Sequence, residues 1–358
     1  MKKIISILVL VSLALCIAFS FAGCGEKEEK KVNYKTQSKE ISYSYFNTAS
    51  QISSYGDTSK EQFEKYVKIA DETLGYYHKL FDIYYEYSGV NNIKTINKNA
   101  GKNAVKVDRE LVDFLLYCKE LYTITDGKTN VMLGSVLKIW HDKREEAMES
   151  LGYLDSEKLP SEDELDSANL HTSIDSLVID EVNCEVYISD SLASLDVGAV
   201  AKGYAVEILY KRLKAEGADS IALNVGGNIR TIGLKPEKEL WVTGITNPDM
   251  NAESSIKCRI EIGDSSIVTS GDYERYFVVG EKKYHHIIDP ETLMPAEYFA
   301  SVTIVTADSG LADALSTALF CMSYEDGVKF VENLEGVDVI WIFKDGRLES
   351  TDGIVFKS

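Results

Sequence analysis

The chain has 358 residues and a formal net charge of −19 at pH 7, because 57 acidic side chains outnumber 38 basic ones. A protein of this charge is a poor candidate for binding nucleic acid or an anionic membrane surface, since both present negative phosphates. The length suffices for a large hydrophobic core, in one large domain or two closely packed ones.

The N-terminus is typical of an exported protein. Two lysines follow Met1, an apolar run covers residues 4–19, and small residues lead to Cys24. The segment Phe21-Ala-Gly-Cys24 resembles a bacterial lipobox, which implies cleavage before Cys24 and attachment of lipid such as palmitate; a plain transmembrane anchor or a non-lipidated signal is the alternative. We expect a lipoprotein signal peptide (1–23), a flexible tether (24–39) and a folded domain (40–358) on the extracytoplasmic face of the cell membrane.

The remaining cysteines of that domain are far apart in sequence and form no C-x-x-C pair, and the five histidines show no zinc-ligand spacing. Each of these cysteines stands in an apolar pattern, which favours buried thiols, although disulfides stay open; they are Cys118, Cys184, Cys258 and Cys321.

In the first half of the domain, aromatic and β-branched residues predict a strand over 41–54. A capping box at Thr58 predicts a helix that continues to about Tyr87, and Asp108 is expected to cap a second helix. The charged stretch 142–166 is expected to be a surface helix, and residues 176–190 alternate as a hairpin around Asn183.

In the second half, helices are expected over 307–322, capped by Asp308, and over 324–334. Strands are expected at 220–224, 240–245, 255–262, 266–269, 275–279, 301–305, 337–343 and 347–350. Because many of these strands are linked as hairpins, the pattern predicts an α+β fold rather than a doubly wound sheet.

Between these halves, the stretch Asp196-Val-Gly-Ala-Val-Ala-Lys-Gly203 joins a short apolar segment to an apolar-periodic run over 200–213. The free N–H groups of a helix start suit a phosphate, and Lys202 adds a cation one turn in. An ordinary strand–helix junction is the alternative. The Gly226-Gly227 turn offers similar backbone amides, or merely turns the chain.

Two further segments carry chemistry. Asp313 and Thr317 share one face of an otherwise apolar helix, where a buried carboxylate needs a partner such as Mg²⁺ or backbone donors. His286 and Asp289 flank two isoleucines before a Pro turn, which favours either a His near developing charge or an exposed His beside a turn-making Asp at a surface or cleft. The aromatic and Arg of segment 270–277 suit a planar ligand or a strand start.

Taken in order, these segments closely resemble the ApbE family of flavin transferases from about residue 40 to the end. The matching motifs are Asp196-Val-Gly-Ala-Val-Ala-Lys-Gly203, Asn224-Val-Gly-Gly-Asn228, Ser270-Gly-Asp-Tyr-Glu-Arg-Tyr276, His285-His-Ile-Ile-Asp-Pro290 and Ala312-Asp-Ala-Leu-Ser-Thr317. The earlier Phe46-Asn-Thr48 and Thr125-Asp-Gly-Lys-Thr-Asn-Val131 match in position.

The resemblance implies a mixed α/β, T-fold-like architecture with antiparallel sheets, packed helices and FAD in a cleft between subdomains. It implies Mg²⁺-dependent transfer of FMN from FAD to a Ser or Thr hydroxyl of a partner protein, with release of AMP. The partner would resemble a subunit of a membrane redox pump.

By the same resemblance, His286 and Asp313 are catalytic. The implied metal ligands are Ala199 (through its carbonyl), Asp313 and Thr317, with Ser316 nearby. The implied FAD contacts are Phe46, Lys128, Thr129, Asn130, Asp196, Lys202, Gly226, Gly227, Tyr273, Ile287 and Ile288.

Two departures from the family pattern weaken parts of this assignment. Thr129-Asn130 stands where the family has Phe-Asp, and Thr292-Leu293 stands where it has Thr-Gly. The residues also leave two other functions open: an Mg²⁺-dependent FAD pyrophosphatase, in which water replaces the acceptor hydroxyl, and a flavin-carrying lipoprotein without chemistry.

Overall fold

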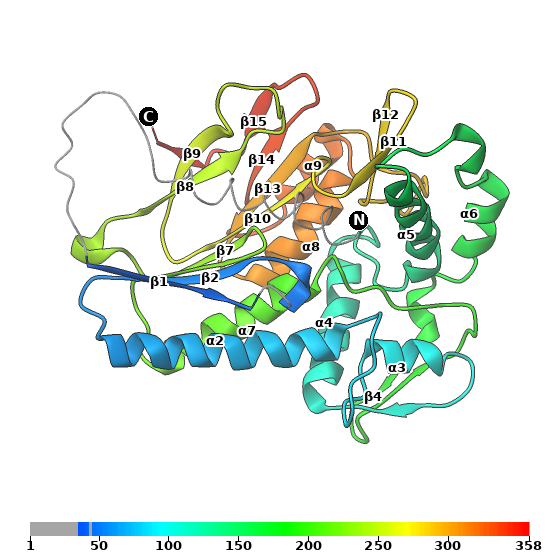
Figure 1. Ribbon diagram of the computed structural model, residues 1–358, viewed down its shortest axis with the longest axis horizontal. Coiled ribbons are helices and arrows are strands. Elements are labelled where there is room, and N and C mark those ends of the chain that lie inside the picture. Colours follow the sequence, from blue (N-terminus) through cyan, green and yellow to red (C-terminus); the bar gives the residue numbers. More distant parts are fainter. Residues whose placement is uncertain (1–34, 43–44, 358) are drawn as a thin grey trace.

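The computed structural model describes residues 35–42 and 45–357, so the predicted signal peptide and Cys24 lie outside the described residues. Its centre is an eight-stranded sheet in which every neighbouring pair is antiparallel (Figure 1). In spatial order the strands are β1 (Thr36–Ile41), β2 (Ser50–Tyr55), β6 (Ile221–Val225), β7 (Asn228–Ile232), β10 (Ser266–Gly271), β13 (Ser301–Thr306), β14 (Asp338–Ile342) and β15 (Leu348–Ser350).

Helices cover one face of this sheet and a small sheet covers the other. Side chains alternate between the faces of a strand, so Val339 and Trp341 pack among helix residues while Ile340 and Ile342 pack against the small sheet. The helices are α2 (Lys60–Phe81), α7 (Ala201–Ala215), α8 (Ser309–Phe320) and α9 (Tyr324–Val331), and the small sheet is β8 (Trp241–Thr246), β9 (Ile256–Ile262) and β16 (Val355–Phe356).

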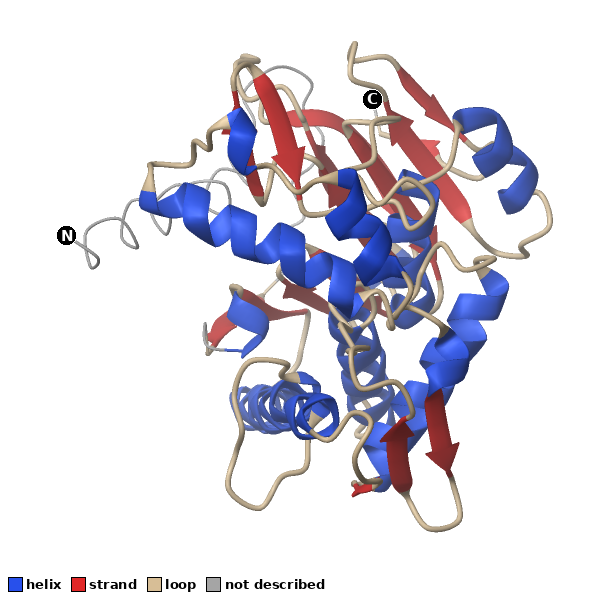
Figure 2. Cartoon of the chain, turned by 90° about the vertical axis from the view of Figure 1, so that its right-hand side faces the viewer, coloured by secondary structure: helices blue, strands red, loops and turns tan. Residues whose placement is uncertain are grey.

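The rest of the chain packs beside these layers (Figures 1 and 2). Trp140 stacks on Tyr284 and donates its indole N–H to the Leu293 carbonyl at 2.9 Å, which fixes α5 to a hairpin. The elements are α3 (Ile93–Lys98), β3 (Val105–Lys106), α4 (Arg109–Ile124), α5 (Gly134–Glu149), α6 (Glu162–Asn169), β4 (Leu177–Asp180), β5 (Glu185–Ile188), β11 (Tyr276–Val279) and β12 (Lys282–His285).

The α+β class and the antiparallel sheets are confirmed, and the corrections concern boundaries. Helix α2 is capped by Ser59, whose hydroxyl accepts the Gln62 N–H, rather than by Thr58. It ends at Phe81 instead of about Tyr87, because the Asp82 carboxylate accepts the N–H groups of Tyr84 and Tyr85 in a non-helical turn.

The single strand expected over 41–54 is two strands, separated by a 3₁₀ turn at Tyr45–Asn47 in which Phe46 has a positive φ of 52°. The sequence does not predict short elements such as α3, β3 and β16, because each is too short to show a periodic pattern of apolar residues. The expected surface helix over 142–166 is the end of α5 and the separate α6.

All four cysteines of the described residues are free; Cys118 and Cys321 are buried as expected, whereas Cys184 and Cys258 are partly exposed. Within the described residues, no helix combines the length and apolar character that a membrane crossing needs.

Gly203 lets α7 and α8 approach closely. A Cβ at this position would lie 2.2 Å from the Ser309 carbonyl oxygen and 2.5 Å from the Asp313 Cβ, both far inside van der Waals contact. The first obstacle is backbone and cannot rotate away, so only glycine permits this helix spacing.

We therefore expect Gly203→Ala to lower the free energy of unfolding by about 2–3 kcal/mol through overpacking, as measured by urea denaturation. Gly327→Ala on α9 is the matched control, because its added Cβ meets side chains only, a Leu319 methyl group at 3.3 Å and the Trp341 ring at 3.7 Å. Equal stability of both variants would show that the α7–α8 contact tolerates a wider spacing.

Candidate active site

The first part of the site is the turn that leads into α7. Asp196 donates its N–H to the Val131 carbonyl at 2.8 Å, and its carboxylate accepts the Gly198 N–H at 2.9 Å. The helix begins at Ala201 after the turn, so Ala199 lies just outside it and Lys202 in its first turn. The predicted tight turn and helix start are both present.

Asp313 of α8 faces this helix start. Its Oδ2 accepts the Gly203 N–H at 2.8 Å and its Oδ1 lies 3.3 Å from the Lys202 Nζ, while the residue is only 5% exposed. The buried carboxylate therefore has the backbone donor that was one of the two alternatives, and in addition the ammonium group of Lys202. Thr317 lies one turn further along and is partly exposed.

Ser316 is buried and its hydroxyl is engaged by protein atoms. It donates to the Asp313 carbonyl at 2.9 Å and lies 2.8 Å from the Ser270 hydroxyl of β10. These contacts tie α8 to the sheet at the level of Asp313, so Ser316 has a positioning role that is independent of any ligand.

The donor set near Asp313 fits Mg²⁺, which prefers oxygen and is usually held by one or two carboxylates together with substrate phosphates. Among residues 35–42 and 45–357, no group of three or more His, Cys, Asp or Glu side chains comes together as a metal cluster. The implied Mg²⁺ site has one carboxylate, the Thr317 hydroxyl and a backbone carbonyl, so it would not form such a cluster. Metal binding there would depend on Asp313.

The turn after α4 packs against α8. Thr129 is buried and donates its hydroxyl to the Ala314 carbonyl at 2.8 Å, and Asn130 donates its amide to the Thr172 carbonyl at 2.9 Å. Thr129 thus ties the turn to α8 and Asn130 ties it to the loop at Thr172, so a ligand contact from this turn would come from its backbone or from Lys128.

Lys128 forms two ion pairs. Its Nζ lies 3.2 Å from the Asp289 carboxylate and 3.0 Å from the Glu291 carboxylate. Burial alone would lower the pKa of Lys128, but its bonds to Glu291 and Asp289 outweigh burial and raise the pKa. Asp289 is 2% exposed, so the expectation that it lies at a surface or cleft is wrong; Lys128 compensates its buried charge.

A second turn comes from the β6–β7 hairpin. Gly226 and Gly227 have φ of 57° and 89°, as a two-residue hairpin turn requires. The Gly226 N–H donates to the Ala49 carbonyl at 2.9 Å, two residues after the 3₁₀ turn. Phe46 in that turn donates its N–H to the His78 Nδ1 at 3.3 Å. The structure thus brings Phe46 and the two glycines into one neighbourhood.

His286 follows β12 directly. The residue as a whole is partly exposed, but its Nδ1 is enclosed and has no hydrogen-bond partner among the described residues. Burial and, after it, the positive charge of Arg275 lower the pKa of His286 well below the usual value; Arg144 and Lys202 act in the same sense. The imidazole is therefore neutral at physiological pH.

The remaining predicted FAD contacts differ in which of their atoms a ligand could reach. Ile287 and Ile288 are buried in two hydrophobic clusters, so only their backbones are available to a ligand. Tyr273 lies against Gly271, where any side chain would meet its ring at 2.5 Å, and burial raises the pKa of its phenol above the usual value.

Tyr84 is a further candidate, which none of the sequence motifs includes. Its side chain is 49% exposed, its ring lies 5.4 Å from that of His141, and burial followed by the charge of Asp196 raises the pKa of its phenol. An exposed aromatic beside Asp196 suits a planar ligand. Its position in a tyrosine-rich run hid it, because neighbouring Tyr77 is core.

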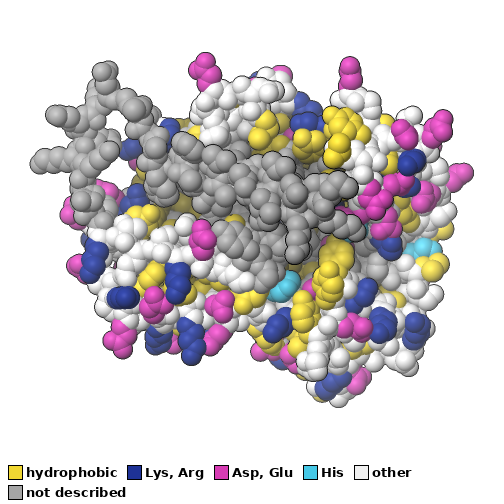
Figure 3. Space-filling model, in the orientation of Figure 1, with side chains coloured by type: hydrophobic (Ala, Val, Ile, Leu, Met, Phe, Trp, Pro, Cys, Tyr) yellow, Lys and Arg dark blue, Asp and Glu magenta, His cyan; other side chains and the backbone are white. Residues whose placement is uncertain are grey.

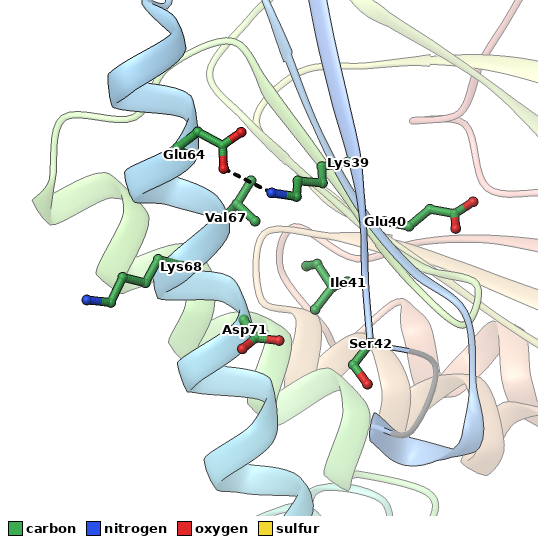
Figure 4. Close-up of a pocket in the computed structure, with 8 residues that line it drawn as sticks. All are labelled: Lys39, Glu40, Ile41, Ser42, Glu64, Val67, Lys68 and Asp71. Atoms are coloured by element: carbon green, nitrogen blue, oxygen red, sulfur yellow. Dashed lines mark hydrogen bonds and ion pairs between the residues drawn. The ribbon is translucent and has the colours of Figure 1, made fainter.

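A separate surface hollow lies between β1 and α2 (Figure 4). None of the predicted site residues lines it, and an ion pair between Lys39 and Glu64 spans one side. The lining residues are Lys39, Glu40, Ile41, Ser42, Glu64, Val67, Lys68 and Asp71.

Comparison with known proteins agrees with this geometry. A model of the ApbE family matches residues 42–341. The FAD:protein FMN transferase of Treponema pallidum is 32% identical over 277 residues, which cover 74% of each chain, and that of Haemophilus influenzae is 26% identical over 93% of this chain and 91% of its own.

Solved structures of the family share the fold. The ApbE protein of Thermotoga maritima superposes with a TM-score of 0.74 at 28% identity, covering 89% of this chain and 97% of its own. The flavin transferase ApbE of Vibrio cholerae gives 0.72 at 23% identity, with coverages of 88% and 97%.

The burial of His285 predicts how the stability of the fold changes with pH. It is buried, with Nε2 2.8 Å from the Ala296 carbonyl and Nδ1 accepting the Ile287 N–H at 3.2 Å, a pattern that needs the neutral ring. Burial lowers its pKa to about 4. Below pH 6.5 the unfolded chain binds a proton that the native chain does not, so stability falls as pH drops from 6.5 to 4.

We expect this single group to account for roughly 3 kcal/mol of unfolding free energy across that window. In His285→Gln, chemical denaturation at pH 7 and pH 4.5 should give a smaller difference than in the original protein. Parallel stability curves for the two proteins would mean that His285 is not the titrating group.

Proposed function

Because the chain belongs to the ApbE family, we propose that it is an FAD:protein FMN transferase that uses Mg²⁺ and joins FMN to a Ser or Thr hydroxyl of a partner protein. The observation that carries the proposal is Asp313, a buried carboxylate that is held by Lys202 and Gly203 at the start of α7 and faces a phosphate-binding type of turn.

In the proposed reaction, the acceptor oxygen attacks the phosphorus of the FMN half of FAD. The new P–O bond replaces the bond to the AMP phosphate, which leaves with the electron pair. The acceptor proton passes to the neutral imidazole of His286, the group whose pKa burial and neighbouring cations keep low. Lys202 offsets negative charge on the diphosphate.

Mg²⁺ bound by Asp313, Thr317 and the Ala199 carbonyl would supply further charge neutralisation at the diphosphate. Ser316 would support these ligands through its bond to the Asp313 carbonyl. The proposed contacts to the rest of FAD come from Asp196, Tyr273, the backbones of Ile287 and Ile288, and the neighbourhoods of Phe46, Lys128–Asn130 and Gly226–Gly227.

We also propose where in the cell the enzyme acts. A lipid on Cys24 would hold the enzyme at the extracytoplasmic face of the cell membrane, and its acceptor would be a subunit of a membrane redox pump exposed on that side. Acidic and basic side chains are interspersed on the face shown in Figure 3, so the charges there do not select one class of partner.

We expect the purified protein, incubated with FAD, Mg²⁺ and a candidate acceptor domain, to give a fluorescent flavin band on the acceptor and free AMP. EDTA and Asp313→Ala should each abolish both products, whereas Asp326→Ala on the exposed surface of α9 should not. FMN and AMP without a labelled acceptor would favour the pyrophosphatase, and bound, intact FAD would leave the carrier. Full activity of Asp313→Ala would refute the metal assignment.

We expect His286→Ala to lower kcat by about a hundredfold or more while changing FAD affinity little, since removal of a general base acts on the reaction step. Single-turnover transfer and flavin fluorescence titration separate the two effects. Losses of equal size in both measurements would make His286 a binding residue instead.

A further inference from the structure

Two hydrogen bonds join α7 to α8, and in each of them a backbone N–H of one helix meets a carboxylate of the other. In the first, the Gly203 N–H donates to Asp313 at 2.8 Å. In the second, the Ser309 N–H at the start of α8 donates to the Glu207 carboxylate at 3.2 Å. The partners are four positions apart on each helix and occur in opposite order, so the helices are antiparallel here and the bonds lie about one turn apart. The proposed reaction uses Asp313, but it does not use Glu207.

Glu207 is a buried acid in the middle of α7. The residue is 6% exposed, and besides the Ser309 N–H its carboxylate has Arg230 Nε at 3.7 Å and Lys211 Nζ at 3.5 Å. Burial and, after it, the charge of Asp308 raise the pKa of Glu207, so its surroundings disfavour the charged form. A buried ion pair is often no more stabilising than apolar side chains of similar volume. Stability of the fold alone therefore does not account for a carboxylate at this position.

Arg230 holds this carboxylate from the central sheet. It belongs to β7, is 2% exposed, and its Nη1 lies 2.7 Å from the Asp264 Oδ1. Its guanidinium carbon also lies 3.6 Å from the centroid of the Tyr210 ring of α7. Because the planar guanidinium is fixed by these two contacts, the charge that faces Glu207 has a fixed position. The second bond therefore ties the start of α8 to α7 and, through Arg230, to the sheet.

The placement of α8 against α7 also decides the placement of the proposed metal ligands. Ala199 lies two residues before the start of α7, whereas Asp313 and Thr317 belong to α8. Mg²⁺ demands a nearly octahedral set of oxygens at about 2.0–2.1 Å, so even a small shift between the helices would weaken its binding. Groups that orient metal ligands without touching the metal are typically worth about tenfold to a hundredfold in metal affinity.

We propose that Glu207 is a positioning residue for the metal site. It fixes α8 against α7, so that the ligands on α8 meet the Ala199 carbonyl at the distance that Mg²⁺ requires. The inference rests on the proposed function for the identity of the metal. Glu207 would not touch the metal itself, since its carboxylate is bonded to Ser309, one helical turn from Asp313. The sequence motif at the start of α7 ends at Gly203 and does not include Glu207.

The test measures metal binding rather than transfer. Mg²⁺ and Ca²⁺ are titrated separately into the purified protein by isothermal titration calorimetry, without FAD or acceptor, and Asp313→Ala gives the heat that does not come from the site. Glu207→Leu nearly keeps the side-chain volume but removes the acceptor of the Ser309 N–H, and we expect it to bind Mg²⁺ about tenfold to a hundredfold more weakly. Ca²⁺ accepts longer and more variable bonds, so its affinity should fall less and the preference for Mg²⁺ should decrease.

Two further variants separate positioning from a general loss of structure. Glu207→Gln keeps an oxygen that can accept the Ser309 N–H, and it should recover most of the Mg²⁺ affinity. Glu216→Gln removes an exposed carboxylate directly after α7 and should bind both metals like the original protein. In Glu207→Leu, Arg230 keeps Asp264 as its partner, so we expect this variant to fold, which urea denaturation checks.

Unchanged Mg²⁺ affinity in Glu207→Leu would overturn the positioning role. So would equal losses for Mg²⁺ and Ca²⁺ that Glu207→Gln does not recover, since that pattern indicates a general disturbance of the fold. If the original protein binds no more Mg²⁺ than Asp313→Ala does, the metal assignment and the positioning role are both refuted. Because the assay needs no acceptor, a protein that shows the expected metal binding but labels no acceptor would refute the transferase and leave the positioning role intact.

Discussion

The site depends on the close approach of α7 and α8 at Gly203. With no side chain there, the Gly203 N–H reaches the Asp313 carboxylate at 2.8 Å and Lys202 of the same turn reaches its other oxygen at 3.3 Å. A carboxylate buried this deeply is costly without such partners. One helix start therefore both stabilises Asp313 and presents it next to the turn at Asp196.

Other contacts hold this pair in place from the sheet and from the surrounding loops. Ser270 at the end of β10 contacts Ser316, and Thr129 donates to the Ala314 carbonyl, so α8 is bonded on two sides within one turn of Asp313. These hydroxyls belong to segments that are distant in sequence. Their effect is to fix the position of a helix in a site that would bind a charged ligand.

The charged side chains that act on His286 are cations, although the chain as a whole is strongly acidic. In this strongly acidic protein, burial and, after it, the positive charges of Arg275, Arg144 and Lys202 lower the pKa of one histidine. Of these cations, Lys202 is the one that contacts Asp313 and that the proposed reaction places beside the diphosphate of FAD. A neutral base beside a group of cations is a physically consistent arrangement for attack on a phosphorus atom, because both the incoming oxygen and the phosphate are negative or become so.

The sequence by itself determined the α+β class, most of the longer elements and the Asp313–Thr317 face, because these follow from periodicity, capping and helical spacing, which are local properties. Tertiary structure decided what no local pattern encodes: that Asp289 is buried against Lys128, that Thr129 binds α8, and that Trp140 of α5 stacks on Tyr284 of the β11–β12 hairpin. Lys128 and Asp289 are 161 positions apart in the sequence and Thr129 and Ala314 are 185 apart, so only the packing of the folded chain brings them together. These contacts arise from long-range packing, which a single sequence does not display.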